Sequence, residues 1–157
     1  MQLTLHADYA FRVLVYLGTH PGRLVTTQEI STGYGISKNH LVRVIHTLAE
    51  HKHVAIQPGR SGGITLAREL NRIRLGDVIR QAEPNLRLVE CFAPDTNTCP
   101  IAPVCSLKGM LNEALNAFIE NLNRYTVADV IDRSGSSRLT SAFAVFADWN
   151  TANASRD

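Results

Sequence analysis

The feature of this 157-residue sequence that most constrains its fold is the order of the elements predicted within residues 4–66. Hydrophobic periodicity and capping signals predict three helices followed by two short β-prone runs. These segments are 4–18, 26–32, 37–51, 54–57 and 64–66. A turn containing Gly33 and Gly35 joins the second and third helices, as in a helix-turn-helix, and the hairpin that follows is typical of a wing. We therefore predict a winged helix-turn-helix within a mainly α fold that has a small β-hairpin.

The third predicted helix has one face suited to a core and one polar face. Its apolar stripe is Leu41, Val44, Ile45 and Leu48. Thr26, with Glu29 three residues later, forms a capping-box pattern before the second helix, and Ser37 is an N-cap for the third. A polar, basic helix face is usually only a solvated face. It is the order of the elements that favours DNA binding here.

The residues expected to contact DNA lie at three places in this arrangement. The N-terminal part of the third helix would enter the major groove, where Lys and Arg bond guanine and Asn bonds adenine. The start of the second helix favours phosphate, and the hairpin tip would reach the minor groove or the backbone. The candidates are Thr27, Gln28, Ser37, Lys38, Asn39, His40, Arg43 and Arg60. The charge distribution permits this, because residues 1–90 hold eleven Lys and Arg against seven Asp and Glu.

All three cysteines lie in one proline-rich stretch, at Cys91, Cys99 and Cys105. Proline cannot continue a helix or a sheet ladder, so this segment is predicted to be an irregular loop. Three thiolates on a short loop suit a soft metal or an iron–sulfur cluster. One disulfide with a spare thiol is the alternative, but nothing in the sequence indicates an oxidising compartment.

The longest helical signal runs from Cys105 to about Tyr125, and its apolar stripe needs a partner. Because helix-turn-helix proteins commonly pair to read palindromes, we prefer a coiled-coil-like homodimer over packing within one chain. The residues assigned to that interface are Leu107, Leu111, Ala114, Phe118 and Leu122.

Four regions follow from these patterns. They are a winged helix-turn-helix DNA-binding domain at 1–83, a cysteine-rich cluster-binding loop at 84–105, a dimerisation helix region at 106–132 and a C-terminal tail at 133–157. Residues 134–137 are predicted to be a linker. The tail beyond them is either disordered or docked as a short helix.

The sequence also argues against several classes of protein. Its start has no basic or apolar signal-peptide region, and no apolar run approaches the roughly 20 residues of a membrane span. We therefore expect a cytoplasmic protein without a membrane partner. There is no nucleophile–base pairing, phosphate loop or pair of carboxylates at useful spacing, so we expect no enzyme.

Several runs resemble the NsrR-type nitric-oxide-sensing repressors of the IscR/NsrR superfamily of iron–sulfur winged-helix regulators. The resemblance covers residues 1 to about 132. It is carried by MQLT at the start, SKNHLV in the third helix, GRSGG in the hairpin turn, RLGDV at 74–78, YTVADV at 125–130 and the three-cysteine loop.

The resemblance implies a homodimer with one cluster per subunit, with [4Fe–4S] favoured over [2Fe–2S]. The implied ligands are Cys91, Cys99 and Cys105, with Asp8 from the other subunit as the fourth. IscR has a histidine where this chain has Lys108, which favours the NsrR type. The gap between the first two cysteines is seven residues, against the usual five, and loops lengthen at small cost.

The function implied is a DNA-binding repressor that senses nitric oxide by cluster nitrosylation and releases the promoters of nitrosative-stress genes. One alternative is a regulator on the same scaffold that responds to iron, oxygen or cysteine status. The other is a zinc-stabilised winged-helix protein, with His6 or Asp8 as the fourth zinc ligand.

Overall fold

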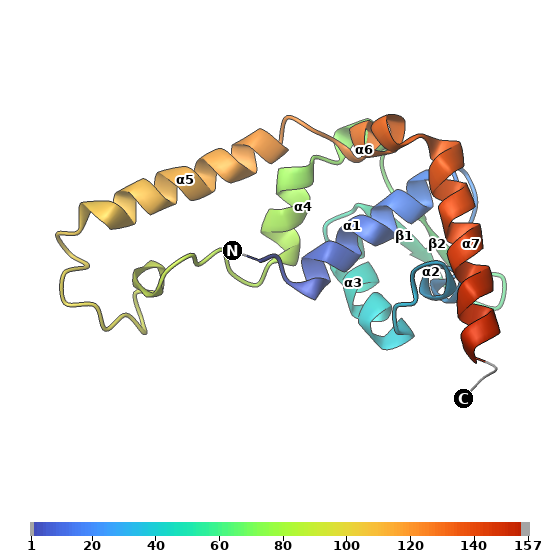
Figure 1. Cartoon of the computed structure of the whole chain (residues 1–157), viewed down its shortest axis with the longest axis horizontal. Helices are drawn as coiled ribbons and strands as arrows, with labels where there is room; N and C mark the ends of the chain where they lie inside the picture. Colours follow the sequence, from blue (N-terminus) through green and yellow to red (C-terminus); the bar gives the residue numbers. More distant parts are fainter. Residues whose placement is uncertain (1, 155–157) are drawn as a thin grey trace.

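The computed structural model describes residues 2–154, which form a helical body and an arm that extends from it (Figure 1). The helices are α1 (Leu5–Gly18), α2 (Thr27–Tyr34), α3 (Lys38–Glu50), α4 (Leu75–Ala82), α5 (Ser106–Leu122), α6 (Val127–Ser134) and α7 (Ser136–Ala154), with single 3₁₀ turns at η1 (Leu70–Arg72) and η2 (Glu90–Phe92). The antiparallel strands β1 (Val54–Gln57) and β2 (Gly63–Leu66) form the hairpin. The predicted mainly α fold with a small hairpin is confirmed.

The body is built around α1, whose sequence is apolar on most of its circumference. Ala7, Ala10, Val13 and Leu14 are fully buried, and the helix packs against α3, α4, α6 and the hairpin. The hairpin joins this core through Ile64, which pairs with Val25 in the segment before α2. The wing is therefore attached to the body through β2, and the exposed turn beyond β1 projects into solvent.

The first three helices begin where the capping residues predict. Thr4 caps α1, and Thr26 forms a complete capping box with Glu29 at the start of α2. Ser37 caps α3, and its hydroxyl accepts a hydrogen bond from the His40 amide at 3.4 Å. Local hydrogen bonds thus set the boundaries of the helix-turn-helix.

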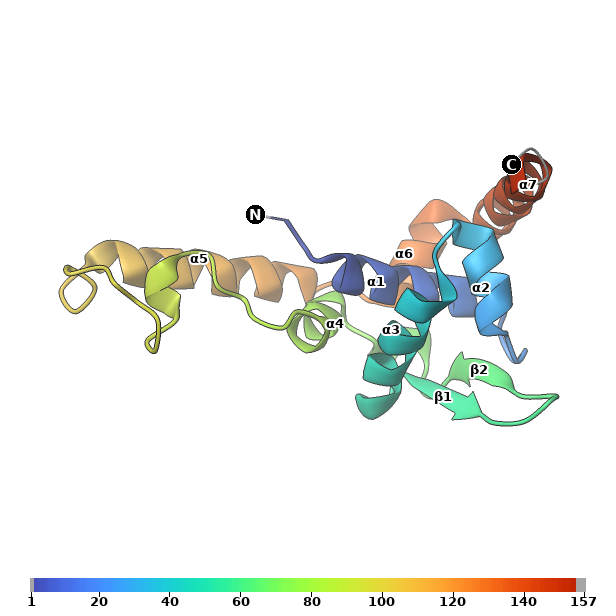
Figure 2. The ribbon, with the colours of Figure 1, turned by 90° about the horizontal axis from the view of Figure 1, so that it is seen from below.

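The arm consists of the cysteine loop and α5, and it joins the body at α4, on which the C-terminal end of α5 packs (Figures 1 and 2). Only Leu115 and Ile119 of α5 are buried. Gly76 on α4 allows this contact, because its backbone lies against the Ile119 carbonyl and the Asn123 side chain. Asn123 also accepts a hydrogen bond from the Asp77 amide at 2.9 Å.

The C-terminal segment is helical. Residues 134–137 are not the predicted linker, because they contain the end of α6, the cap residue Gly135 and the start of α7. With 19 residues, α7 is longer than the 17-residue α5, so the prediction that the longest helix follows Cys105 is wrong for residues 2–154. Of the tail for which disorder or docking was open, residues 136–154 form this docked helix, and 155–157 lie outside the described residues. Within residues 2–154, no helix is both long and apolar enough to cross a membrane.

Candidate nucleic-acid interface and cysteine loop

The helix α3 presents the predicted reading residues to solvent. Ser37, Lys38, Asn39, His40 and Arg43 are all exposed. The opposite face of α3, formed by Leu41, Val44, Ile45 and Leu48, is buried in the core. A helix held by one apolar face with a polar N-terminal end free in solvent has the form required to enter a major groove.

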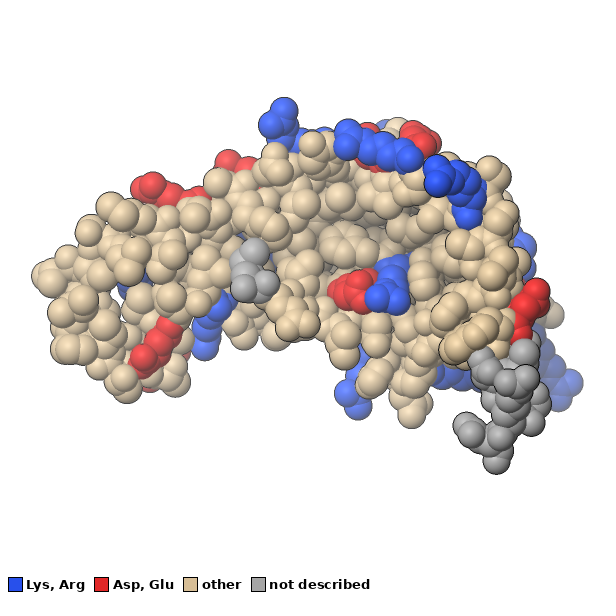
Figure 3. Space-filling model, in the orientation of Figure 1, with Lys and Arg blue, Asp and Glu red and all other residues tan. Residues whose placement is uncertain are grey.

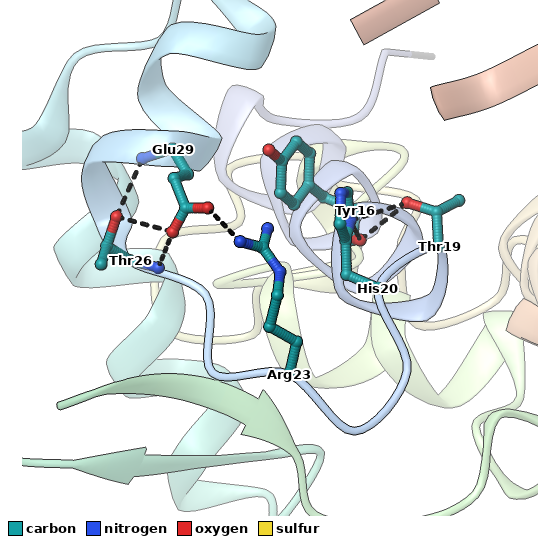
Figure 4. Close-up of polar contacts among 6 residues, drawn as sticks. All are labelled: Tyr16, Thr19, His20, Arg23, Thr26 and Glu29. Carbon is teal, nitrogen blue, oxygen red and sulfur yellow. Dashed lines mark hydrogen bonds and ion pairs between the residues drawn. The ribbon is translucent and has the colours of Figure 1, made fainter. Parts of the chain in front are cut away.

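The start of α2 is fixed by a cluster of polar contacts (Figure 4). Thr26 Oγ1 accepts a hydrogen bond from the Glu29 amide at 3.1 Å, and the Thr26 amide donates to Glu29 Oε2 at 2.7 Å. Arg23 pairs with the other oxygen of this carboxylate at 2.7 Å. Although burial favours the neutral acid, the hydrogen bonds from Thr26 and the Arg23 guanidinium hold the pKa of Glu29 below its usual range. The cap therefore stays charged at neutral pH.

The connection from α1 to α2 is held by contacts of Thr19 and His20 with Tyr16 at the end of α1. Thr19 Oγ1 and His20 Nδ1 both donate to the Tyr16 carbonyl oxygen, each at 2.8 Å, and the His20 ring stacks on Tyr16 with ring centroids 4.6 Å apart. At the start of α2, Thr27 is half-buried and Gln28 is exposed. Both predicted phosphate-contacting residues therefore lie at a rigid helix N-terminus.

The wing carries Arg60 at its tip, and this side chain is exposed. The strands pair in register from Val54 with Leu66 to Gln57 with Gly63, and the Gly62 amide donates to the Gly59 carbonyl at 3.0 Å to close the turn. Figure 2 shows the hairpin projecting from the body beside α2 and α3. In Figure 3 the visible face carries few charged side chains, and Lys and Arg side chains protrude along both its upper and its lower edge.

Contacts from α1 to α3 were not predicted from the sequence. His6 Nε2 lies 3.1 Å from Thr47 Oγ1, and the Tyr9 and His40 ring centroids are 6.1 Å apart. These contacts join the first turns of α1 to both ends of the exposed face of α3. An i to i+4 spacing within one helix is visible in a sequence, but a contact between two helices has no such signal.

The three cysteines are free thiols, each half-buried, on the loop at the end of the arm. Glu90 accepts hydrogen bonds from the Thr98 amide at 2.6 Å and from the Thr98 hydroxyl at 2.7 Å, which closes the first part of the loop. These hydrogen bonds lower the pKa of Glu90. Cys105 lines a hollow of about 620 Å³ between the loop and α5, together with Phe92 and Lys108.

The cysteine loop suits a soft metal group by its donor chemistry, since it offers three unpaired thiols on one flexible connection. Within the described part of the chain, however, no three His, Cys, Asp or Glu side chains are gathered closely enough to hold a metal ion. The structure thus places the three cysteines on one loop without bringing their sulfur atoms into one ligand set.

Asp8 lies on α1 in the body, away from the cysteine loop on the arm (Figures 1 and 2). Its carboxylate pairs with Arg12 one turn later at 2.7 Å, with both side chains about two-fifths exposed. This is the helix pairing that the spacing of the two residues allows. A contact between Asp8 and the cysteines would have to come from a second copy of the chain.

The stripe of α5 assigned to dimerisation is incompletely covered by its own chain. Leu107 and Ala114 are exposed, and Leu111, Phe118 and Leu122 are half-buried. The buried side of the helix, at Leu115 and Ile119, faces α4 instead. A dimer through this stripe remains a prediction.

A winged helix-turn-helix with an exposed polar reading helix defines the class of DNA-binding proteins to which this geometry belongs. The sequence matches the Rrf2 family, described as iron-dependent transcriptional regulators, over residues 3–133. The chain therefore belongs to the Rrf2 family of transcriptional regulators, which are DNA-binding proteins and not enzymes, as the sequence predicts.

Comparison with individual relatives shows which members of the family this chain is similar to. The chain is 46% identical over 132 residues to the HTH-type transcriptional regulator NsrR of Shouchella clausii. The aligned region covers 83% of this chain and 89% of that protein. It is 43% identical over 132 residues to NsrR of Bacillus subtilis, with 83% and 90% covered. The resemblance to NsrR-type regulators stated from the motifs is confirmed.

Solved structures with the same fold include IscR of T. potens, with a TM-score of 0.69 at 23% identity, covering 88% of this chain and 91% of that one. CymR, the global cysteine regulator of B. subtilis, matches with a TM-score of 0.66 at 20% identity and covers 85% and 98%. At these identities the match establishes the winged-helix fold.

The Lys38→Ala and Arg60→Ala variants are expected to bind DNA more weakly. Each removes a cation from a predicted DNA-contacting position. For each phosphate that is no longer neutralised, the slope of log affinity against log salt should fall by about 0.9. The measurement is fluorescence anisotropy across a salt series, with a duplex that this protein selects from a random-sequence pool.

The matched control is Lys108→Ala, which removes a cation from the arm. A fall in affinity for Lys108→Ala equal to that for Lys38→Ala would mean that net charge, and not the reading face, sets the affinity.

Proposed function

We propose that this chain is an iron–sulfur-dependent transcriptional repressor that releases its promoters in response to nitric oxide. The observation that carries the proposal is the presence of three free, half-buried thiols on one loop, in a chain 46% identical to an NsrR regulator. The family description as iron-dependent regulators supports iron over zinc. The genes released would be those of nitrosative stress, and the site of action would be the cytoplasm.

In this proposal two copies pair through the α5 stripe and read a two-fold symmetric promoter. Each α3 enters the major groove through Lys38, Asn39 and His40, while Arg60 reaches the minor groove or the backbone. The two reading helices must lie about 34 Å apart to span one turn of DNA. A small change in that separation would cost much of the specific affinity.

Cys91, Cys99 and Cys105 would hold the cluster, with [4Fe–4S] favoured over [2Fe–2S], and Asp8 of a second copy would supply the fourth ligand. The cluster, when bound, would supply iron that reacts with nitric oxide, and the Asp8 carboxylate would be the weakest of its four ligands. Within its own chain, the Asp8 carboxylate pairs with Arg12 at 2.7 Å, so Arg12 would compete with the cluster for this carboxylate. His6 contacts Thr47, and Tyr9 contacts His40, so a displacement of α1 would be transmitted to α3 through these contacts.

Iron, zinc and acid-labile sulfide per chain, measured on anaerobically purified protein with a visible spectrum, test this proposal. We expect a brown protein with stoichiometric iron and sulfide, whose spectrum collapses and whose affinity for the selected duplex falls when nitric oxide is added. A colourless protein with about one zinc per chain would overturn the proposal that the cysteines hold an iron–sulfur cluster. If the protein with its cluster bound DNA equally well with and without nitric oxide but responded to oxygen or to iron supply, that result would overturn the proposal that nitric oxide is the signal.

A further inference from the structure

The helix α7 is an addition to the family unit. The Rrf2 match ends at residue 133, and α7 runs from Ser136 to Ala154. Gly135, with φ of 81°, turns the chain sharply between α6 and α7. Because α6 is fixed to α1, with Ile131 packed against Gly18, the start of α7 has a defined position on the body.

The inner face of α7 packs on α1 and α2 (Figure 1). The Phe143 ring lies 5.0 Å from the Tyr16 ring of α1 and 5.0 Å from the Tyr34 ring at the end of α2, nearly edge-on to the latter. Leu139 joins the same apolar cluster. Tyr34 is also covered by the Arg12 guanidinium, 5.7 Å from its ring centre. The end of α2 is thus enclosed between α1 and α7.

The next turn of α7 covers the turn of the helix-turn-helix itself. Gly35 caps α2 in the left-handed conformation, with φ of 64°, and the Phe146 ring lies beside it on the side where a Cβ would point. A Cβ at Gly35 would lie 3.2 Å from the Phe146 ring and 3.6 Å from the Asn150 amide nitrogen. Two residues later, Ser37 begins the reading helix. Phe146 therefore contacts the backbone that sets the direction of α3.

The outer face of α7 carries large apolar side chains that are open to solvent. Val145 is 70% exposed and Trp149 is 59% exposed. The inner face of α7 therefore contacts the body, whereas the outer face is exposed to solvent. This asymmetry is expected of a helix that supports the helix-turn-helix through one face.

We propose that α7 is an intramolecular brace that fixes the α2–turn–α3 unit in its DNA-reading orientation and so raises the specific affinity for DNA. Phe143 and Phe146 are its positioning residues; they act through Tyr34 and Gly35 and do not touch DNA. The proposal rests on DNA binding by the family and is independent of the cluster and of its signal.

The test compares Phe143→Ala with the matched control Val145→Ala in the full chain. We expect Phe143→Ala to weaken binding to the selected duplex about tenfold, since the contacts of the Phe143 ring with Tyr16 and Tyr34 would be lost and α7 would no longer be held against the end of α2 through them. Binding to an unrelated duplex should stay within about twofold, because non-specific affinity depends on phosphate neutralisation. Val145→Ala should change neither affinity. Hydrogen exchange in Phe143→Ala should rise at the Gly35 and Ile36 amides, which bond to the Ser31 carbonyl.

Three outcomes would overturn the brace. One is equal specific affinity for the two variants. Another is a parallel fall in specific and non-specific affinity, which a simple loss of folded protein would produce. The last is global unfolding of Phe143→Ala, which would make α7 part of the core and not a brace on a complete family unit. A Phe143→Leu chain, which keeps an apolar side chain against Tyr34, should retain most of the affinity.

Discussion

A Gly76→Ala chain is expected to lose about 3 kcal/mol of its free energy of unfolding, because a methyl group would be forced into a close-packed helix junction. The added Cβ would lie 2.5 Å from the Ile119 carbonyl oxygen and against the Asn123 side chain. Backbone of α5 cannot move aside as a flexible side chain can. The clash would also disturb the hydrogen bond from the Asp77 amide to Asn123 at 2.9 Å. Urea denaturation at one fixed protein concentration measures the loss.

Gly109→Ala is the matched control, since Gly109 is also a glycine within a helix, on α5. A Cβ there meets no atom within 4 Å. Alanine in place of an exposed helical glycine should therefore raise the stability by about 0.5–1 kcal/mol. If both variants had the stability of the parent chain, the α4–α5 junction would not exist in solution, and the arm would be attached differently.

The starts of the first three helices and the position of the hairpin followed from the sequence because their signals are local. The end of α2 did not, because α2 continues through Gly33 to Tyr34 and only Gly35 of the expected turn lies outside it. Thr26 and Glu29 cap α2 from within one turn, and Ser37 does the same for α3. The apolar stripe of α3 and the glycine-rich hairpin turn involve only nearby residues as well. A boundary set by neighbouring residues can be read from their order alone.

The position of α7 could not be predicted because its partners are remote in the chain. Phe143 packs on Tyr16 and Tyr34, more than 100 residues earlier. Apolar residues on both sides of α7 gave no single stripe to assign to a core. The contact between His6 and Thr47 was missed for the same reason, since nothing local marks it.

The candidate site also has one part that local sequence signals predict and one part that they do not. Exposure of the reading residues on α3 was predictable, because it follows from the buried stripe on the opposite face. The ligand set was not, because three thiols on an irregular loop have no hydrogen-bond ladder to fix their separation. Their roles, and that of Asp8, remain predictions that depend on a bound cluster and a second copy of the chain.

A Cys105→Ala chain is expected to lose nearly all of its iron and acid-labile sulfide. Thiolates are the ligands that hold such clusters, and this side chain lines the hollow between the cysteine loop and α5. The variant should show no visible absorption from a cluster, and its affinity for the selected duplex should no longer change when nitric oxide is added. Metal analysis and anisotropy with and without nitric oxide measure both effects.

The Asp8→Ala chain separates the cluster's attachment from its response. An oxygen ligand binds iron less strongly than a thiolate, so three cysteines should retain iron that Cys105→Ala cannot. Asp8→Ala should also keep DNA binding, because the substitution lies outside the reading face of α3 and removes only a half-exposed ion pair with Arg12. Its cluster stability or its response to nitric oxide should change. A response identical to that of the parent chain would exclude Asp8 as the link between the cluster and α1, even if Cys105 proved essential.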